Sequence, residues 1–139
     1  MSGFSPTVVE RIWDRDQGRC ARCGVPLNPN ARGFEWSVHH RCPRSSGGTR
    51  RLWVNEAANG LLLCGTGVTG CHGHVESFRA EAAAQGFLVS ANGCLRADEV
   101  EVTRHALFGS VWLEDDGTWF PSLPQEGPTP ESIEGWVEG

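Results

Sequence analysis

The stretches Val38-His39-His40-Arg41-Cys42-Pro43-Arg44 and Asn59-Gly60-Leu61-Leu62-Leu63-Cys64 contain side chains that bind metals and transfer protons. The second stretch leads on to Gly70-Cys71-His72-Gly73, and the pair Cys20-Ala21-Arg22-Cys23 precedes both. Four thiols are enough to hold one metal ion. The histidines and the asparagine are therefore left for a second site.

Cys20, Cys23, Cys64 and Cys71 predict one tetrahedral structural zinc. The chain has 18 glycines and 8 prolines, which favour loops, and a bound metal stabilises a fold of that kind. Six residues separate Cys64 from Cys71, so the alternative is that these two are ordinary buried thiols. Outside the set, we interpret Cys94 as a lone buried cysteine and Cys42 as a packed thiol, with a stray ligand as the alternative for Cys42.

The length and composition fit one small domain. The chain has 139 residues and no run of 18 apolar residues, so we expect no membrane span. The first residues lack the basic and apolar regions of a signal peptide. We therefore expect a cytoplasmic protein, in which paired thiols bind metal more often than they form disulfides.

Charge is distributed unevenly along the chain. Residues 1–55 hold nine arginines against four acids, a net charge of +5, and residues 56–139 hold three against thirteen, a net of −10. Every basic group is an arginine, which suits bidentate phosphate contacts. Coding bias toward arginine is the alternative explanation. The basic half contains the His-His pair, so an acidic chain could still hold a polyanion there.

The first half of the chain predicts one helix and two short strands. Ser5 as cap and Pro6 at the first helical position begin a helix that ends at Gly18. The first strand candidate spans residues 34–40, and a short buried segment spans 61–63.

A second helix is predicted from Cys71 to Gln85, closed by Gly86. Val75, Phe78 and Ala82 should face the core at helical spacing. A different face carries His72, Glu76 and Arg79.

Residues 87–89, 111–113 and 119–120 predict further β structure, with a hairpin turn at Asp116-Gly117. We therefore expect a domain over residues 1–120, with its core at 20–89 and a β extension at 90–120. Residues 121–139 contain four prolines and four acids but no basic residue, and we interpret them as an acidic, Pro-rich, mostly disordered tail.

In its order of motif residues the sequence resembles the HNH endonuclease family, especially the small HNH proteins of tailed bacteriophages. The resemblance runs from about Val8 to Val89, with the main motif at 38–76. It implies an α+β fold with a zinc-stabilised ββα-metal (His-Me finger) core, here with an N-terminal helix and a C-terminal β-hairpin extension.

The resemblance also implies roles for individual residues. His40 matches the general base, with a structural histidine as the alternative. His39 and His72 match the ligands of a catalytic divalent metal. Asn59 matches the middle asparagine, which orients the base or ties down the loop.

Physical reasoning adds further candidates around this site. Two imidazoles favour transition metals, so Mn²⁺, Ni²⁺, Co²⁺ or Zn²⁺ should compete with Mg²⁺. Glu76 could be a ligand, a surface residue or, as we prefer, a group that supports the ligands. His74 could be a third ligand, but helix geometry turns it elsewhere, and His105 should be structural. Four arginines are candidates for contacts with the substrate. We expect Arg44 to clamp the scissile phosphate, and three others to contact DNA: Arg41, Arg50 and Arg51.

The function implied is a metal-dependent DNA endonuclease, encoded by a phage, acting in the host bacterial cytoplasm and linked to DNA packaging with the terminase. We expect a monomer or weak dimer, because one finger handles one strand. The alternative is a catalytically inactive, zinc-stabilised nucleic-acid-binding module or a packaging accessory protein.

Overall fold

The computed structural model describes residues 3–43, 52–91, 93 and 95–122. Within these ranges the chain forms a mixed α+β fold with one two-stranded and one three-stranded sheet, as expected from the sequence. None of the helices in these ranges is long and apolar enough to cross a membrane. The predictions for Arg44, Arg50, Arg51 and Cys94, and for the tail from residue 123 onward, lie outside the described residues.

Helix α1 (Pro6–Asp16) has the predicted beginning and end. The Ser5 hydroxyl accepts a hydrogen bond from the Val8 backbone N–H, and Pro6 occupies the first turn. Gln17 takes a left-handed conformation after the last turn, and Gly18 follows with φ +65°. The helix therefore stops where the sequence predicted, with Val8 and Ile12 buried.

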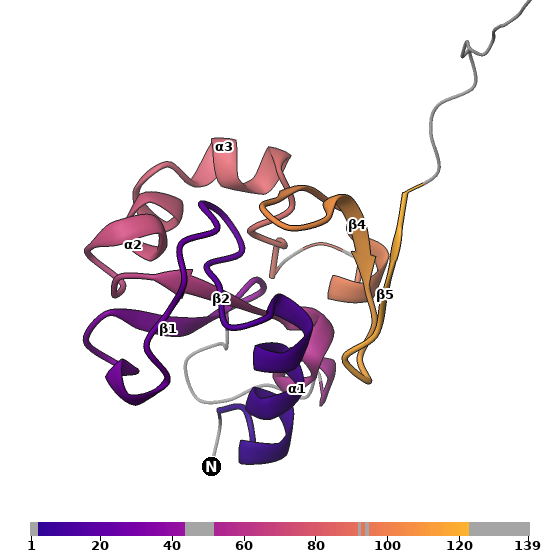
Figure 1. The fold of residues 1–139 in the computed structure, drawn as a ribbon. Coiled ribbons are helices and arrows are strands. Elements are labelled where there is room, and N and C mark those ends of the chain that lie inside the picture. Colours follow the sequence, from indigo (N-terminus) through magenta and orange to yellow (C-terminus); the bar gives the residue numbers. More distant parts are fainter. Residues whose placement is uncertain (1–2, 44–51, 92, 94, 123–139) are drawn as a thin grey trace, which may run out of the picture.

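Strands β1 (Trp36–His40) and β2 (Gly60–Cys64) form an antiparallel pair in which His39 lies opposite Leu61. The helices α2 (Gly70–Ser77) and α3 (Arg79–Ala84) lie on one side of this pair and α1 on the other (Figure 1). A Cβ at position 60 would lie 2.3 Å from Ile12 Cδ1, so a larger residue there would displace this side chain of α1. Both strands match the predicted positions.

The second predicted helix is interrupted. Helix α2 (Gly70–Ser77) ends before Phe78, whose backbone leaves the helical region (φ −115°, ψ 66°), and α3 (Arg79–Ala84) begins after it. Val75 and Ala82 are buried as expected, but Phe78 is 56 % exposed, so its placement in the core was wrong. Because of this break, the helical spacing that relates Val75 to Phe78 and Ala82 in the sequence does not continue through Phe78. Gly86 closes the segment at φ +85°.

The three-stranded sheet has the order β3 (Val102–His105), β4 (Gly109–Leu113) and β5 (Trp119–Pro121). The β4–β5 hairpin confirms the predicted turn, with Gly117 at φ +93°. Residues 87–89 form no strand; they are an irregular buried segment. Strand β3 lies within the predicted β extension, but its bounds were not identified, because only its two end residues are buried.

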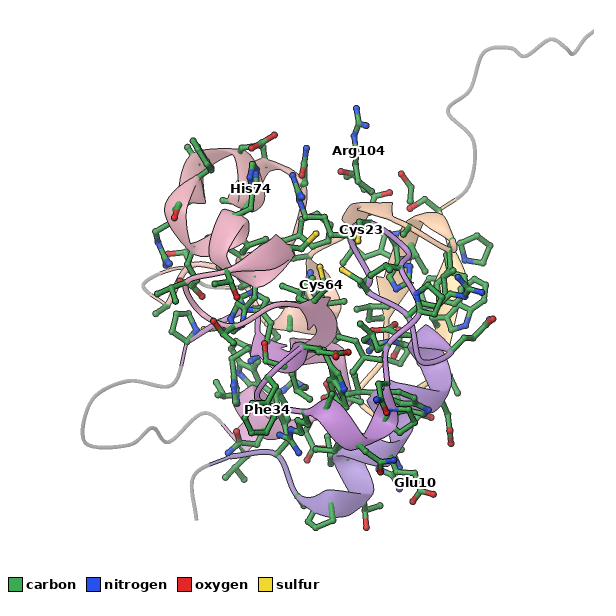
Figure 2. All side chains as sticks on the ribbon, turned by 60° about the vertical axis from the view of Figure 1, so that its left-hand side comes forward. Glu10, Cys23, Phe34, Cys64, His74 and Arg104 are labelled. Atoms are coloured by element: carbon green, nitrogen blue, oxygen red, sulfur yellow. The ribbon has the colours of Figure 1, made fainter. Side chains whose placement is uncertain are left out.

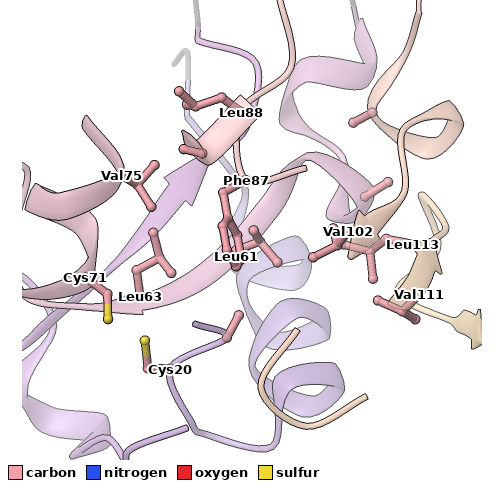
Figure 3. Packing of buried hydrophobic residues seen from close by; sticks show 14 residues of the cluster. Cys20, Leu61, Leu63, Cys71, Val75, Phe87, Leu88, Val102, Val111 and Leu113 are labelled. Carbon is pink, nitrogen blue, oxygen red and sulfur yellow. The ribbon is translucent and has the colours of Figure 1, made fainter. Parts of the chain in front are cut away.

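One apolar cluster connects both sheets, α2 and the segment after α3 (Figure 3). Around Phe87 it gathers buried side chains from β2, α2, β3 and β4, namely Leu61, Leu63, Val75, Val102, Val111 and Leu113. Cys20 and Cys71 lie at its edge. The packed core therefore holds Cys20 and Cys71 in place.

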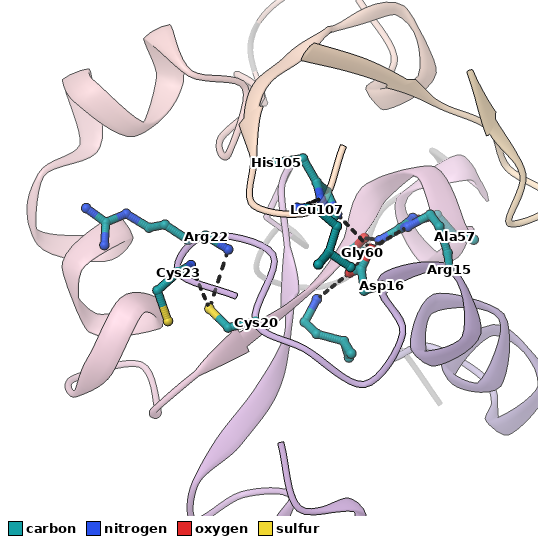
Figure 4. A network of polar contacts seen from close by, with 10 residues as sticks. Arg15, Asp16, Cys20, Arg22, Cys23, Ala57, Gly60, His105 and Leu107 are labelled. Atoms are coloured by element: carbon teal, nitrogen blue, oxygen red, sulfur yellow. Dashed lines mark hydrogen bonds and ion pairs between the residues drawn. The ribbon is translucent and has the colours of Figure 1, made fainter. Parts of the chain in front are cut away.

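A buried polar network joins α1 to the rest of the fold (Figure 4). Arg15 and His105 both contact the Asp16 carboxylate, at 2.8 and 2.9 Å, and the Leu62 N–H donates to it at 3.0 Å. Burial alone would raise the pKa of Asp16, but the Arg15 guanidinium and the His105 ring lower it to about 2. His105 is thus structural, as expected.

Candidate metal centres

The sulfurs of Cys20, Cys23, Cys64 and Cys71 all lie within 4.8 Å of one another and could hold a metal ion. We call them the four-cysteine cluster. The Cys23 and Cys64 sulfurs are 3.8 Å apart (Figure 2). Cys20 Sγ accepts hydrogen bonds from the backbone N–H groups of Arg22 and Cys23 at 3.4 and 3.5 Å. Cys64 Sγ accepts one from the backbone N–H of Cys71 at 3.4 Å. This donor set fits tetrahedral zinc.

The six-residue gap between Cys64 and Cys71 is taken up by a tight loop. Gly65 and Gly70 adopt φ +85° and +61°, and a Cβ at position 65 would meet the Thr69 carbonyl at 2.1 Å. The Thr66 N–H donates to the Thr69 hydroxyl at 2.9 Å. The loop therefore returns Cys71 to Cys64, so the unusual spacing is compatible with one metal site.

Electrostatics around Cys71 favour a cation. Burial raises the pKa of the Cys71 thiol, and the neighbouring Cys20 and Cys64 raise it further, while an Arg22 N–H at 3.4 Å from Cys71 Sγ lowers it. A bound cation counters the first two effects, because a coordinated thiol is deprotonated outright. Zinc and Arg22 would together stabilise the thiolate.

A second group, His39, His72 and Glu76, also offers ligand atoms within 4.8 Å of one another. We call it the histidine–glutamate cluster. Glu76 Oε2 lies 3.7 Å from both His39 Nδ1 and His72 Nε2. The structure thus brings the two predicted ligands together, and it puts Glu76 within ligand reach, whereas we had preferred a supporting role for this residue.

The other ring nitrogen of each histidine is already held. His39 Nε2 lies 2.7 Å from the Phe87 carbonyl oxygen, and His72 Nδ1 lies 2.6 Å from Ser37 Oγ. Such contacts fix which nitrogen faces a metal. Neither Ser37 nor the Phe87 carbonyl was identified from the sequence. A backbone acceptor such as the Phe87 carbonyl leaves no motif.

Both imidazoles of this cluster are in the form that binds metals. Burial lowers the pKa of His39 to about 3, although the Phe87 carbonyl opposes the shift. Burial also lowers the pKa of His72, against the influence of Glu76. Neutral imidazoles and a carboxylate form a donor set that catalytic zinc uses and that Mn²⁺, Co²⁺ and Ni²⁺ also accept.

His40 ends the same strand as His39 but has different surroundings. Its ring stacks on Phe4, with centroids 4.0 Å apart, and its Nε2 lies 3.0 Å from Asn55 Oδ1. Successive side chains of a strand point to opposite faces. His40 is therefore outside the histidine–glutamate cluster. Asn55 was missed, because nothing in its local sequence distinguishes it from other loop residues.

Asn59 is fully buried and ties down the loop. Its side-chain oxygen accepts the Cys42 N–H at 2.8 Å, and its amide donates to the carbonyls of Cys42 and Val54 at 3.0 and 2.8 Å. The sequence suggested that Asn59 either orients the base or ties down the loop, and these contacts match the second role. The amide joins the chain leaving β1 to the chain that enters β2.

Arg41, which the sequence suggested as a DNA contact, lies in the interior of the fold. It is fully buried, and its guanidinium donates to the carbonyl oxygens of Gly86, Ala58, Ala97 and Val100 at 2.6–2.9 Å. Four of its five N–H groups are used in this way, and because the side chain is fully buried it is not exposed to a phosphate. Burial lowers its pKa to about 9, so it remains charged at neutral pH.

We expect Arg41→Met to lower the free energy of unfolding by roughly 3 kcal/mol or more, since each buried carbonyl left without a donor costs about 1–3 kcal/mol. Urea unfolding of both proteins measures the difference. The matched control is Arg104→Met at an exposed position, where a change within about 0.5 kcal/mol is expected. Equal unfolding midpoints for all three proteins would contradict the role assigned to Arg41.

The predictions for His74 and Cys42 agree with the structure. His74 faces away from the cluster and lies 3.0 Å from Glu81, as helix geometry predicted. Cys42 packs beside Val54 and Val89 as a buried thiol.

No family model, curated protein or solved structure matches the chain.

Proposed function

We propose that the chain is a metal-dependent DNA endonuclease of the HNH type, with a ββα-metal core stabilised by zinc in the four-cysteine cluster. The observation that carries this proposal is the histidine–glutamate cluster. Two imidazoles and a carboxylate converge beside an antiparallel strand pair, and each imidazole is oriented by a second contact. Three protein ligands leave further coordination positions open, as catalytic metal sites require.

In this proposal His39, His72 and Glu76 hold the divalent metal, which would polarise a phosphodiester and stabilise the leaving oxygen. His40 accepts the proton of the attacking water as general base. A tautomer that donates Nε2–H to Asn55 Oδ1 would carry its lone pair on Nδ1, and the stack on Phe4 holds the ring plane. Asn59 holds the loop that follows His40.

The second candidate is a zinc-stabilised nucleic-acid-binding module without catalysis. The observation that favours it is the position of His40, which packs against Phe4 and Asn55 rather than among the metal-binding groups. A structural histidine would have the same contacts. The two candidates differ in whether phosphodiester bonds are broken.

Nicking of supercoiled plasmid separates the candidates. We expect nicking with added Mn²⁺, Ni²⁺, Co²⁺ or Mg²⁺, and none when the added metal is chelated. Glu76→Gln should lose at least about ten- to a hundredfold in rate, because even groups that only support the ligands of a metal contribute that much. Glu81→Gln is the matched control, because Glu81 pairs with His74 outside the cluster. Intact plasmid with every metal would exclude the enzyme.

The biological setting is also a proposal, and it rests on the family resemblance alone. A phage-encoded enzyme of this kind would act in the host bacterial cytoplasm and take part in DNA packaging with the terminase. It would act as a monomer or weak dimer, cutting one strand per finger. Nicked rather than linear first products would agree with a monomer.

A further inference from the structure

Two arginines from distant parts of the chain meet in a hollow beside the four-cysteine cluster. Arg22, between the first two cysteines, and Arg104 of β3 line this hollow of about 770 Å³. Glu81 is the one carboxylate among its lining residues in the described chain, and it lies 3.0 Å from His74 Nε2. The hollow belongs to neither metal centre.

Backbone contacts hold the two arginines on the same surface. The Ala106 N–H donates to the Ala21 carbonyl at 2.6 Å, which joins the segment after β3 to the turn between Cys20 and Cys23. A Cβ at Gly24 would lie 3.5 Å from Ala106 Cβ, so the same two segments also pack closely. The juxtaposition of Arg22 and Arg104 is therefore part of the fold.

The two segments are basic within an acidic protein. Residues 17–27 and 102–110 contain Arg19, Arg22 and Arg104 and no Asp or Glu, while the whole chain has a net charge of −5. The Arg19 guanidinium donates to the Gly24 carbonyl at 3.0 Å, which holds it near Ala106. Arg104 extends into solvent (Figure 2), and among the described residues it makes no ion pair with a carboxylate.

We propose that Arg19, Arg22 and Arg104, which we call the knuckle patch, bind phosphates of the DNA backbone away from the metal centre. This inference rests on the proposed function, because that function is the reason for taking DNA as the ligand. Arg22 contacts Cys71, and the next residue, His72, belongs to the histidine–glutamate cluster. Both surfaces therefore adjoin the first turn of α2. A chain of phosphates can reach both, whereas a single phosphate can reach only one.

Binding of the full-length protein to a fluorescent DNA duplex, measured by anisotropy without added divalent metal, tests the knuckle patch. We expect Arg104→Ala to weaken binding roughly three- to tenfold and to reduce the slope of log K against log salt by about 0.9, the value for one lost phosphate contact. Adding Arg19→Ala should lower the slope again. Arg22 is left intact because it also contacts Cys71 Sγ.

Arg96→Ala is the matched control, because that arginine is exposed but pairs with Asp98 and Asp115; it should bind like the wild type. Equal affinity and salt slope for wild type and the Arg19/Arg104 double variant would overturn the knuckle patch, as would a wild type that binds no duplex. Because no cleavage is measured, binding that depends on Arg104 supports the patch even if plasmid nicking fails.

Discussion

Cys71→Ser protein should contain no zinc and should lack a cooperative unfolding transition, whereas wild-type protein should contain about one zinc per chain. The serine removes one of four sulfurs that converge at the edge of the core. Structural zinc contributes roughly 10–16 kcal/mol in zinc-finger peptides, and a whole domain is stable by only about 5–15 kcal/mol. Elemental analysis and thermal melting followed by circular dichroism measure both effects.

Cys42→Ala is the matched control for this prediction. Cys42 is also buried, but it packs beside Val54 and Val89, apart from the four sulfurs. Its loss should leave the zinc content unchanged and cost only the small destabilisation of a truncated core side chain. A wild-type protein that folds without zinc, or a Cys71→Ser protein that melts like the Cys42→Ala control, would contradict the structural metal.

His40→Ala is expected to reduce the rate of plasmid nicking about 10²- to 10⁴-fold, which is the typical contribution of a general base. Metal binding should be unchanged, because the ligands come from His39, His72 and Glu76. Asn55→Ala should cause a smaller loss, since it removes the contact that orients the His40 ring. Single-turnover nicking at saturating metal measures the chemical step for each variant.

His74→Ala serves as the control for His40→Ala. His74 makes a tilted ring contact with Phe78 and pairs with Glu81 on the other side of α2 from the cluster, so its loss should leave the rate within a factor of about two. If His40→Ala nicks as fast as His74→Ala, then His40 is structural and the base lies elsewhere. Equal nicking by the two variants does not by itself support the non-catalytic module. That candidate requires wild-type protein that fails to nick.

The sequence predicted those parts of the site that depend on residue type and order. Cysteines have few roles in such a chain, so four of them at near-motif spacing indicated a shared metal, and the structure clusters all four. His39 and His72 were paired through the family resemblance, and the structure brings their ring nitrogens close together. That they hold a metal stays a prediction.

Arg41 shows where the sequence was insufficient. An arginine beside a His-His pair in a basic stretch resembles a phosphate contact, yet four carbonyls from distant segments enclose it. Backbone acceptors carry no sequence signature, and the same limit hid the Phe87 carbonyl behind His39. Phe78 was misplaced for a related reason, since helical periodicity assumes an unbroken helix.

The most direct test of the central claim is the nicking rate measured as Mn²⁺ is titrated into protein that already carries one zinc. Bound Mn²⁺ and nicked plasmid are determined on the same samples, for wild type and for His72→Ala. We expect the wild-type rate to rise in proportion to a single bound Mn²⁺, and we expect that His72→Ala neither binds this ion nor nicks. A zinc-loaded wild type that binds no further metal, or that nicks equally without it, would contradict a metal-dependent nuclease.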